Sequence, residues 1–192
     1  MKIGLYFGSF NPIHVGHLII ANQLVENSDL DQIWFVVTPH NPFKKKSTLL
    51  DNYQRLEMVY LATKDYDTLK ESDIEFNLPQ PNYTVNTLVH LTEKYPKHDF
   101  ALIMGEDNLK SFHKWKNYQT ILEYHSIYVY PRISEGKVDT QFNNHPKITR
   151  VDAPIIELSS TMFRKALQEV TNVKPLLPEN VLAYLDEMNF YR

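Results

Sequence analysis

The sequence predicts an α/β fold, namely a Rossmann-like, doubly wound and mostly parallel sheet in a single domain of residues 1–192. Short apolar segments rich in β-branched and aromatic residues alternate with segments of helical periodicity along the chain. The 192 residues, of which 43% are hydrophobic, are enough to bury one substantial core. Because no repeat, linker or low-complexity run divides the chain, we expect one unit.

The first three elements should form a βαβ unit. Residues 3–7 are a short apolar run that ends at Gly8, and residues 13–26 then follow a helical period. Residues 33–37, which stop at a Thr-Pro pair, predict a second buried strand. Such a unit crosses over right-handed and makes the two strands parallel. The loop after the first strand is then expected at the carboxyl edge of the sheet, where ligands bind in open α/β folds.

Capping signals and apolar runs place the remaining elements. Asp51 and Gln54 have the spacing of a capping box, so a helix should follow them. Thr84 is expected to cap the next helix, which carries an apolar face. The pattern continues with strands at 100–104 and 126–130, helical residues 118–124, a short strand at 148–151, a helix capped within 159–161 and a last helix from Pro178-Glu179.

Composition excludes several classes of protein. The chain has a formal net charge of −3 and a pI near 6.2. It therefore lacks the broad basic character that duplex nucleic-acid binding requires, and we expect no nucleic-acid partner. The absence of cysteine excludes disulfides, thiolate chemistry and Cys-based zinc sites. No run of about 18 uncharged apolar residues and no signal peptide are found, so a cytoplasmic protein without a membrane partner is expected. The sequence leaves open whether the chain forms a homo-oligomer.

The strongest motif lies between the first strand and the first helix. Two histidines three residues apart are expected on one face of a helix, near an end whose free N–H groups and dipole favour anions. Two glycines in the same segment permit a close backbone approach and keep space between the histidines. A single histidine here would more often be a cap or a buried structural residue, but the pair favours phosphate binding, and no third ligand accompanies it to predict a metal site. The predicted phosphate site comprises Gly8, Ser9, Phe10, His14, Gly16 and His17.

A second motif is a cluster of hydroxyl side chains at a predicted helix start. Ser160 and Thr161 are followed one turn later by Arg164. Hydroxyls, free amides and a guanidinium can together bind a polyphosphate. Taken alone, this segment is typical of a serine cap beside a solvated arginine. It becomes a candidate because a triphosphate needs more donors than one helix end supplies.

Further candidates follow other predicted strands. Lys44 lies in a lysine-rich loop after the second strand, although such runs are usually solvated. Asp107 follows the strand at 100–104, and Trp115 comes shortly after it. The indole could stack on a flat ring, or it could equally be an ordinary core aromatic.

These groups suit a reaction in which an acceptor phosphate attacks the α-phosphorus of ATP and displaces pyrophosphate. The nucleophile is already an anion, so positioning and charge stabilisation suffice without a catalytic base. His14, His17 and Arg164 are the candidates for stabilising the developing charge. Mg²⁺ held mainly by the phosphates of ATP would share that task.

The motifs also resemble a known family. Phe10, Pro12, His14, Gly16 and His17 match the GxFxPxHxGH pattern of bacterial nicotinate-nucleotide adenylyltransferases, members of the HxGH nucleotidyltransferase superfamily. The resemblance covers nearly the whole chain. It continues in Pro81-Asn82-Tyr83-Thr84 with Thr87-Leu88, Gly105-Glu106-Asp107 with Phe112 and Trp115, Ser159-Ser160-Thr161 with Arg164, and the ending Phe190-Tyr191-Arg192.

The resemblance implies a Rossmann-like fold and a step of NAD biosynthesis, in which AMP moves from ATP to nicotinate mononucleotide to give deamido-NAD and pyrophosphate. It assigns the two histidines and the Ser160, Thr161 and Arg164 block to ATP. Thr84, Asp107 and Trp115 look like the acceptor site.

The chain departs from the family pattern at two places. Phe7 and Asn11 stand where many members carry Gly and Asp, and the loop at 39–44 reads Pro-His-Asn-Pro-Phe-Lys instead of the commoner Pro-Pro-His-Lys form. The second departure leaves the role of Lys44 open. The alternatives are a nicotinamide-mononucleotide adenylyltransferase, a phosphopantetheine adenylyltransferase, or a nucleotide sensor that does not turn over.

Overall fold

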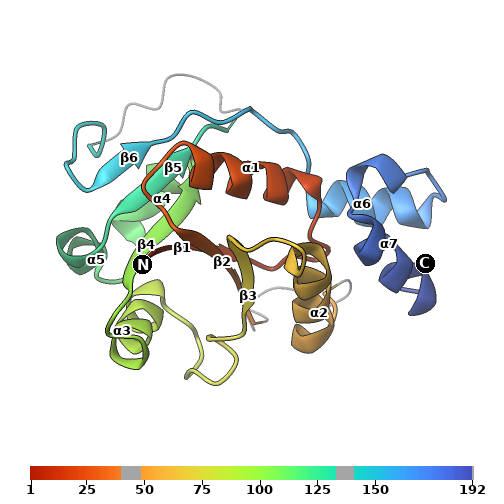
Figure 1. Ribbon diagram of the computed structural model, residues 1–192, viewed down its shortest axis with the longest axis horizontal. Coiled ribbons are helices and arrows are strands. Elements are labelled where there is room, and N and C mark those ends of the chain that lie inside the picture. Colours follow the sequence, from red (N-terminus) through yellow and green to blue (C-terminus); the bar gives the residue numbers. More distant parts are fainter. Residues whose placement is uncertain (40–48, 133–140, 192) are drawn as a thin grey trace.

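A six-stranded parallel sheet forms the centre of the molecule (Figure 1). The computed structural model describes residues 1–39, 49–132 and 141–191, and its strands follow the order β3-β2-β1-β4-β5-β6. All five neighbouring pairs are parallel. This is the order of doubly wound dinucleotide-binding folds, in which the winding reverses between the first and fourth strands. The predicted α/β fold with a parallel sheet is confirmed.

The sequence of the central strands reflects burial on both faces. Ile3 and Leu5 of the first strand belong to one core cluster, whereas Tyr6 belongs to the other. Neighbouring side chains on a strand point to opposite faces, so an unbroken apolar run is needed where helices cover both. The strands are β1 Lys2–Gly8, β2 Gln32–Val37, β3 Leu69–Ser72, β4 Asp99–Gly105, β5 Ile127–Tyr130 and β6 Ile148–Arg150.

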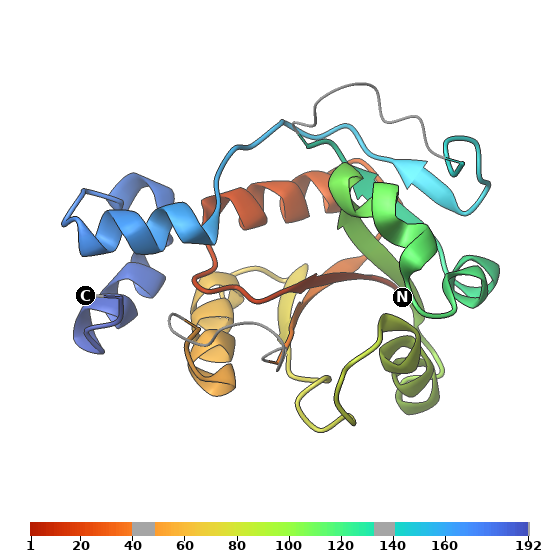
Figure 2. The same cartoon turned by 180° about the vertical axis from the view of Figure 1, so that it is seen from behind.

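Helices cover the two faces in separate groups. The helices are α1 Val15–Glu26, α2 Asn52–Thr63, α3 Thr84–Lys94, α4 Glu106–Ser111, α5 Tyr118–Tyr124, α6 Ser160–Gln168 and α7 Glu179–Glu187, with 3₁₀ turns η1 Phe112–Lys114 and η2 Lys174–Leu176. Core residues of α1, α2, α6 and α7 belong to one cluster, and those of α3, α4 and α5 to the other. Both views show α6 and α7 together at one side of the molecule (Figures 1 and 2). Within the described ranges, no helix is long and apolar enough to cross a membrane.

Two of the predicted helix caps are confirmed. The Asp51 carboxylate accepts from the Tyr53 amide at 2.9 Å, while the Asp51 amide donates to the Gln54 side chain at 3.1 Å. The Ser159 hydroxyl accepts from the Met162 amide at 3.2 Å at the start of α6. Both motifs satisfy N–H groups that a helix leaves unpaired at its first turn.

Three predictions about elements were wrong or incomplete. Thr84 is not the cap of α3, because Tyr83 occupies that position and Thr84 is the first helical residue. The edge strand β3 was missed because its four residues, Leu-Lys-Glu-Ser, contain no apolar run. The six-residue helix α4 was also missed, since it follows β4 directly at Gly105 without a loop to separate the two.

Candidate active site

The predicted histidine motif lies where the winding of the sheet reverses. β1 and β4 are neighbours, and the segment from Gly8 to His17 leaves the carboxyl end of β1. A pocket of about 170 Å³ opens there. Such an edge is the usual ligand position in open α/β sheets. The lining includes Tyr6, His14, Gly16, His17, Asn108, Tyr130, Arg132 and Ile156.

The two histidines are close together, but they are not both on the helix as predicted. His14 is the N-cap of α1 in an extended conformation, and His17 is the third helical residue. Their ring centroids are 3.8 Å apart. The His14 amide donates to Nδ1 of His17 at 3.3 Å, so that nitrogen carries no proton and the neutral ring is protonated at Nε2.

Burial keeps both imidazoles neutral at pH 7. His14 is 3% exposed, and its pKa is lowered to about 4 by burial and, secondarily, by the charge of Arg132. Burial also places the pKa of His17 well below its ordinary range, with further contributions from His14 and Arg132. Each neutral imidazole can offer one N–H donor. Nδ1 of His14 is buried and has no hydrogen-bond partner within the described chain.

Phe10 and the two glycines shape the space around the histidines. Phe10 has φ +45° and a buried side chain, and its ring centroid is 5.1 Å from that of His17. Its side chain is not part of the pocket lining and supports His17 from the core, and its assignment to the ATP site stays a prediction. A Cβ at Gly8 would come within 2.8 Å of the Phe10 ring, and one at Gly16 within 3.0 Å of His14 Nδ1. Both glycines therefore permit this close packing.

The second predicted motif meets the first loop through hydrogen bonds. The Ser160 hydroxyl donates to the Pro12 carbonyl at 2.9 Å, and Arg164 donates to the Asn11 carbonyl at 2.8 Å. Arg164 also donates to the exposed Thr161 hydroxyl at 3.1 Å. The Asn11 side chain accepts from the Tyr191 hydroxyl. The structure thus brings the two motifs together, and it gives Ser160 and Arg164 an anchoring role beside the predicted one.

Arg55 is a structural residue that the sequence reasoning missed. It is fully buried in α2 and donates to the carbonyls of Ser9 at 2.7 Å and Thr38 at 2.9 Å. It also donates to the Leu50 carbonyl at 3.1 Å and to the Asn52 side chain at 2.7 Å. Burial lowers its pKa to about 10, so the guanidinium remains charged. It links the loops after β1 and β2 to the start of α2, and nothing in the sequence distinguishes it from a solvated helical arginine.

Arg132 is a second residue that was missed. It follows β5, and its guanidinium carbon lies 5.9 Å from the centroid of the Tyr130 ring at the pocket wall. Its charge lowers the pKa of both histidines. A cation two residues after a predicted buried strand was the available signal, because the carboxyl ends of parallel strands share one edge.

The predicted acceptor residues lie around β4 and α3. Trp115 is half-buried, with its ring 5.4 Å from that of Phe112. The next residue, Lys116, places its ammonium 4.2 Å from the centroid of the Tyr83 ring, so the start of α3 adjoins this segment. Thr84 is half-buried at that helix start.

Asp107 is exposed in the first turn of α4. Its carboxylate lies so close to Gly105 that a Cβ at that position would clash with it. Lys44 lies outside the described residues. The roles assigned to Thr84, Asp107, Trp115 and the histidines stay predictions.

Comparison with known proteins identifies the family. Residues 5–166 match the family described as Cytidylyltransferase-like. Two relatives named "Probable nicotinate-nucleotide adenylyltransferase" come from Christiangramia forsetii, with 68% identity over 100% of this chain and 98% of the relative, and Flavobacterium johnsoniae, with 66% identity over 100% of both.

Among solved structures, the fold is similar to that of Plasmodium falciparum nicotinic acid mononucleotide adenylyltransferase complexed with NaAD. The TM-score is 0.78 at 19% identity, and the match covers 99% of this chain and 97% of the other. At that identity the likeness concerns the fold, while the two bacterial relatives carry the family assignment. The chain belongs to the nicotinate-nucleotide adenylyltransferases of the cytidylyltransferase-like family.

Proposed function

We infer that the protein transfers AMP from ATP to nicotinate mononucleotide, giving deamido-NAD and pyrophosphate. The two full-length relatives support this reaction, and one observation in the structure carries the mechanism. This observation is the pair of neutral histidines, one buried and one half-buried, at the start of α1 and at the switch point between β1 and β4. The site offers hydrogen-bond donors for phosphate.

The chemistry requires positioning and charge stabilisation. An oxygen of the acceptor phosphate forms a bond to the α-phosphorus of ATP, and the bond from that phosphorus to the bridging oxygen of pyrophosphate breaks. Because the attacking oxygen is already anionic, no residue has to remove a proton. His17 can donate from Nε2, since its Nδ1 is occupied by the His14 amide. The first N–H groups of α1 and the charge of Arg132 add to the stabilisation of the developing negative charge.

ATP should enter as its Mg²⁺ complex. Within the described ranges, no three His, Asp or Glu side chains gather in a group that could hold a metal ion. We therefore expect the phosphates and water to supply most Mg²⁺ ligands, as is usual for this ion with nucleotides.

The start of α3 supports a preference for the acid over the amide. Tyr83 caps this helix without a side-chain hydrogen bond, so its side chain leaves the N–H groups of Thr84 and Val85 for other acceptors. A carboxylate on the pyridine ring can accept from such groups, whereas an amide must direct part of its NH₂ towards them. If Trp115 stacks on the ring, two contacts of this kind give a preference on the order of 100-fold in kcat/KM.

Pyrophosphate release tests the proposal. Purified protein with ATP and Mg²⁺ would be assayed in parallel with nicotinate mononucleotide, nicotinamide mononucleotide and phosphopantetheine. We expect release with the first acceptor at a kcat/KM about 100-fold above the second. Comparable kcat/KM values for the two mononucleotides would favour the nicotinamide alternative. Pyrophosphate release only with phosphopantetheine would identify the protein as a phosphopantetheine adenylyltransferase. ATP binding without release for any acceptor would favour a nucleotide sensor.

A further inference from the structure

Two buried tyrosines share a hydrogen bond in the wall of the histidine pocket. Tyr6 of β1 and Tyr130 of β5 come from strands on either side of β4, and their hydroxyl oxygens are 3.1 Å apart. They are 7% and 6% exposed, respectively, and both line the pocket. Gly105 of β4 leaves the room for this arrangement, because a Cβ there would lie 3.3 Å from Cζ of Tyr130. The histidine pocket therefore contains a hydroxyl pair that the mechanism above does not use.

In the structure this hydrogen bond runs from Tyr6 to Tyr130, and the pair holds two protons but only one bond between them. A phenol has one proton and can also accept. The Tyr6 hydroxyl donates to Tyr130, which is its only hydrogen-bond partner among the described residues. The Tyr130 oxygen thus accepts, and its own proton needs a different acceptor.

The charged groups near Tyr130 do not provide that acceptor. Arg132 lies over the ring and hydrogen-bonds the Tyr130 hydroxyl, but a guanidinium carries only donors, so the Tyr130 oxygen accepts from it. The charge of Asp107 raises the pKa of both tyrosines, but Asp107 forms no hydrogen bond with either one in the described chain. Burial is the main cause that raises both pKa values, so both hydroxyls stay protonated at neutral pH. Tyr130 therefore presents an unpaired, buried O–H donor at the pocket wall.

We propose that the Tyr130 hydroxyl donates a hydrogen bond to a phosphate oxygen of bound ATP, and that Tyr6 positions it. The proposal rests on the proposed function. The Tyr6 ring lies 6.0 Å from the His17 ring and 5.8 Å from the Tyr130 ring, measured between centroids. Phosphates lying over Tyr6 meet the imidazole on one side and the Tyr130 hydroxyl on the other. Tyr6 donates on one side of the Tyr130 oxygen, which leaves the proton of Tyr130 free to point into the pocket.

Two matched variants test the assignment. Tyr130→Phe and Tyr6→Phe each delete one oxygen atom from the same hydrogen bond, so they should lower the midpoint of urea unfolding to a similar extent. Tyr130→Phe should lower kcat/KM for ATP by about 10- to 100-fold, because a donor to a charged group is lost, with the acceptor KM changed less than twofold. Tyr6→Phe keeps the Tyr130 hydroxyl but removes the hydrogen bond that orients it, so kcat/KM for ATP should fall by only about 2- to 5-fold.

Calorimetric ATP binding without acceptor gives a second readout. Tyr130→Phe should weaken ATP binding more than Tyr6→Phe does. Equal kinetic and binding losses in the two variants would overturn the proposal and make the pair structural. This binding experiment holds whichever acceptor the wild-type protein uses, so failure of the proposal and failure of the proposed function can be told apart.

Discussion

The loop from Gly8 to His17, called the histidine loop below, is held very differently from the predicted acceptor side, which comprises Thr84, Asp107 and Trp115. Hydrogen bonds from Arg55, Ser160, Arg164 and Tyr191 fix the histidine loop from two helices, α2 and α6, and the C-terminal segment. On the other side, Asp107 is exposed, Trp115 is half-buried and the start of α3 has no side-chain cap.

This difference separates two tasks. Groups that stabilise a transition state must already be in place, and under the proposed function the anchored loop that carries the histidines would meet that need. Groups that select a small ring can become ordered as the ligand binds. We therefore expect substitutions at the histidine loop to lower stability or kcat, and substitutions on the acceptor side to raise KM.

The largest effect is expected from the buried arginine. Arg55→Met should lower the free energy of unfolding by about 3–5 kcal/mol, because it leaves several buried carbonyl groups without a donor. Arg150→Met is the control, since the Arg150 ion pair with Glu106 is partly exposed and should contribute less than about 1 kcal/mol. Urea denaturation measures both values. Equal losses in the two variants would show that Arg55 does not hold the loops.

His17→Ala should lower kcat by at least about 100-fold while leaving the acceptor KM nearly unchanged. The lost N–H donor acts on charge that develops during the reaction. Steady-state kinetics with both substrates provide the test, and circular dichroism checks the fold. A folded variant with the wild-type kcat would remove His17 from the mechanism.

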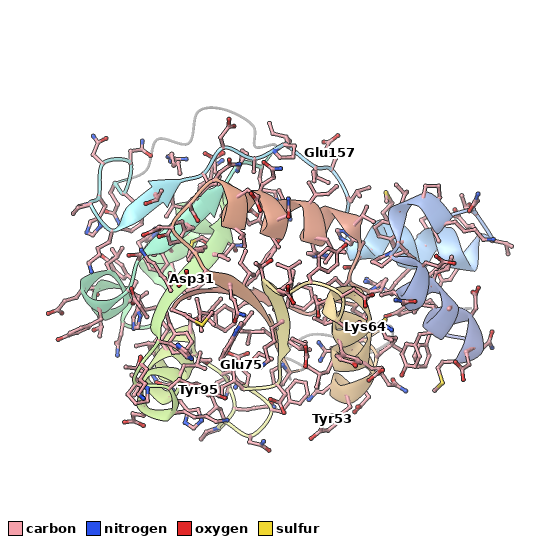
Figure 3. The ribbon with its side chains drawn as sticks, in the orientation of Figure 1. Asp31, Tyr53, Lys64, Glu75, Tyr95 and Glu157 are labelled. Carbon is pink, nitrogen blue, oxygen red and sulfur yellow. The ribbon has the colours of Figure 1, made fainter. Side chains whose placement is uncertain are left out.

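Glu75 should make stability depend on pH. Figure 3 shows it between β3 and α3, where burial raises its pKa from 4.5 to about 6 despite a 2.8 Å hydrogen bond from the Thr87 hydroxyl. The protonated form is favoured in the folded state. Glu75 therefore stabilises the fold below pH 4.5, and this contribution of about 2 kcal/mol is lost as the pH rises through 6.

Urea titrations from pH 4.5 to 7.5 test this expectation with two variants. Glu75→Gln should flatten the pH dependence, since the amide oxygen can still accept from Thr87 without ionising. Glu157→Gln, at an exposed position before α6, is the control and should follow the wild type. Identical curves for Glu75→Gln and the wild type would contradict the expectation.

Trp115→Ala should have the smallest effect, about a 10-fold rise in the KM for nicotinate mononucleotide with the ATP KM unchanged. The ratio of kcat/KM for nicotinate mononucleotide to that for nicotinamide mononucleotide should also fall, because the plane of the pyridine ring is no longer fixed. Tyr124→Ala, at an exposed aromatic on α5, serves as the control. An unchanged KM for nicotinate mononucleotide would show that Trp115 is an ordinary core aromatic and does not stack on the pyridine ring.

Local patterns predicted much of the fold. β1, β2, β4 and β5 are recognisable because helices cover both faces and leave apolar runs. The short edge strand β3 has no such run. The histidine motif was located correctly, but the position of His14 outside the helix depends on a boundary that periodicity fixes only within a few residues.

Residues whose role depends on distant partners could not be found in the same way. Arg55 acts through carbonyl groups of other elements, and its burial has no local signature. The hydroxyls of Tyr6 and Tyr130 meet across 124 residues of sequence. Both cases depend on strand order and helix packing, which a single sequence specifies only through the finished fold.

The anchoring of the histidine loop also bears on how the protein is made. Its contacts with Ser160, Arg164 and Tyr191 span 148, 153 and 180 residues of sequence. Contacts so distant along the chain form late, since a long loop must close first. A nascent chain whose last two helices are still inside the ribosome would carry both histidines and most of the sheet, yet it would lack the contacts that set their geometry. During synthesis, catalytic competence would therefore arise only as the C-terminal segment docks.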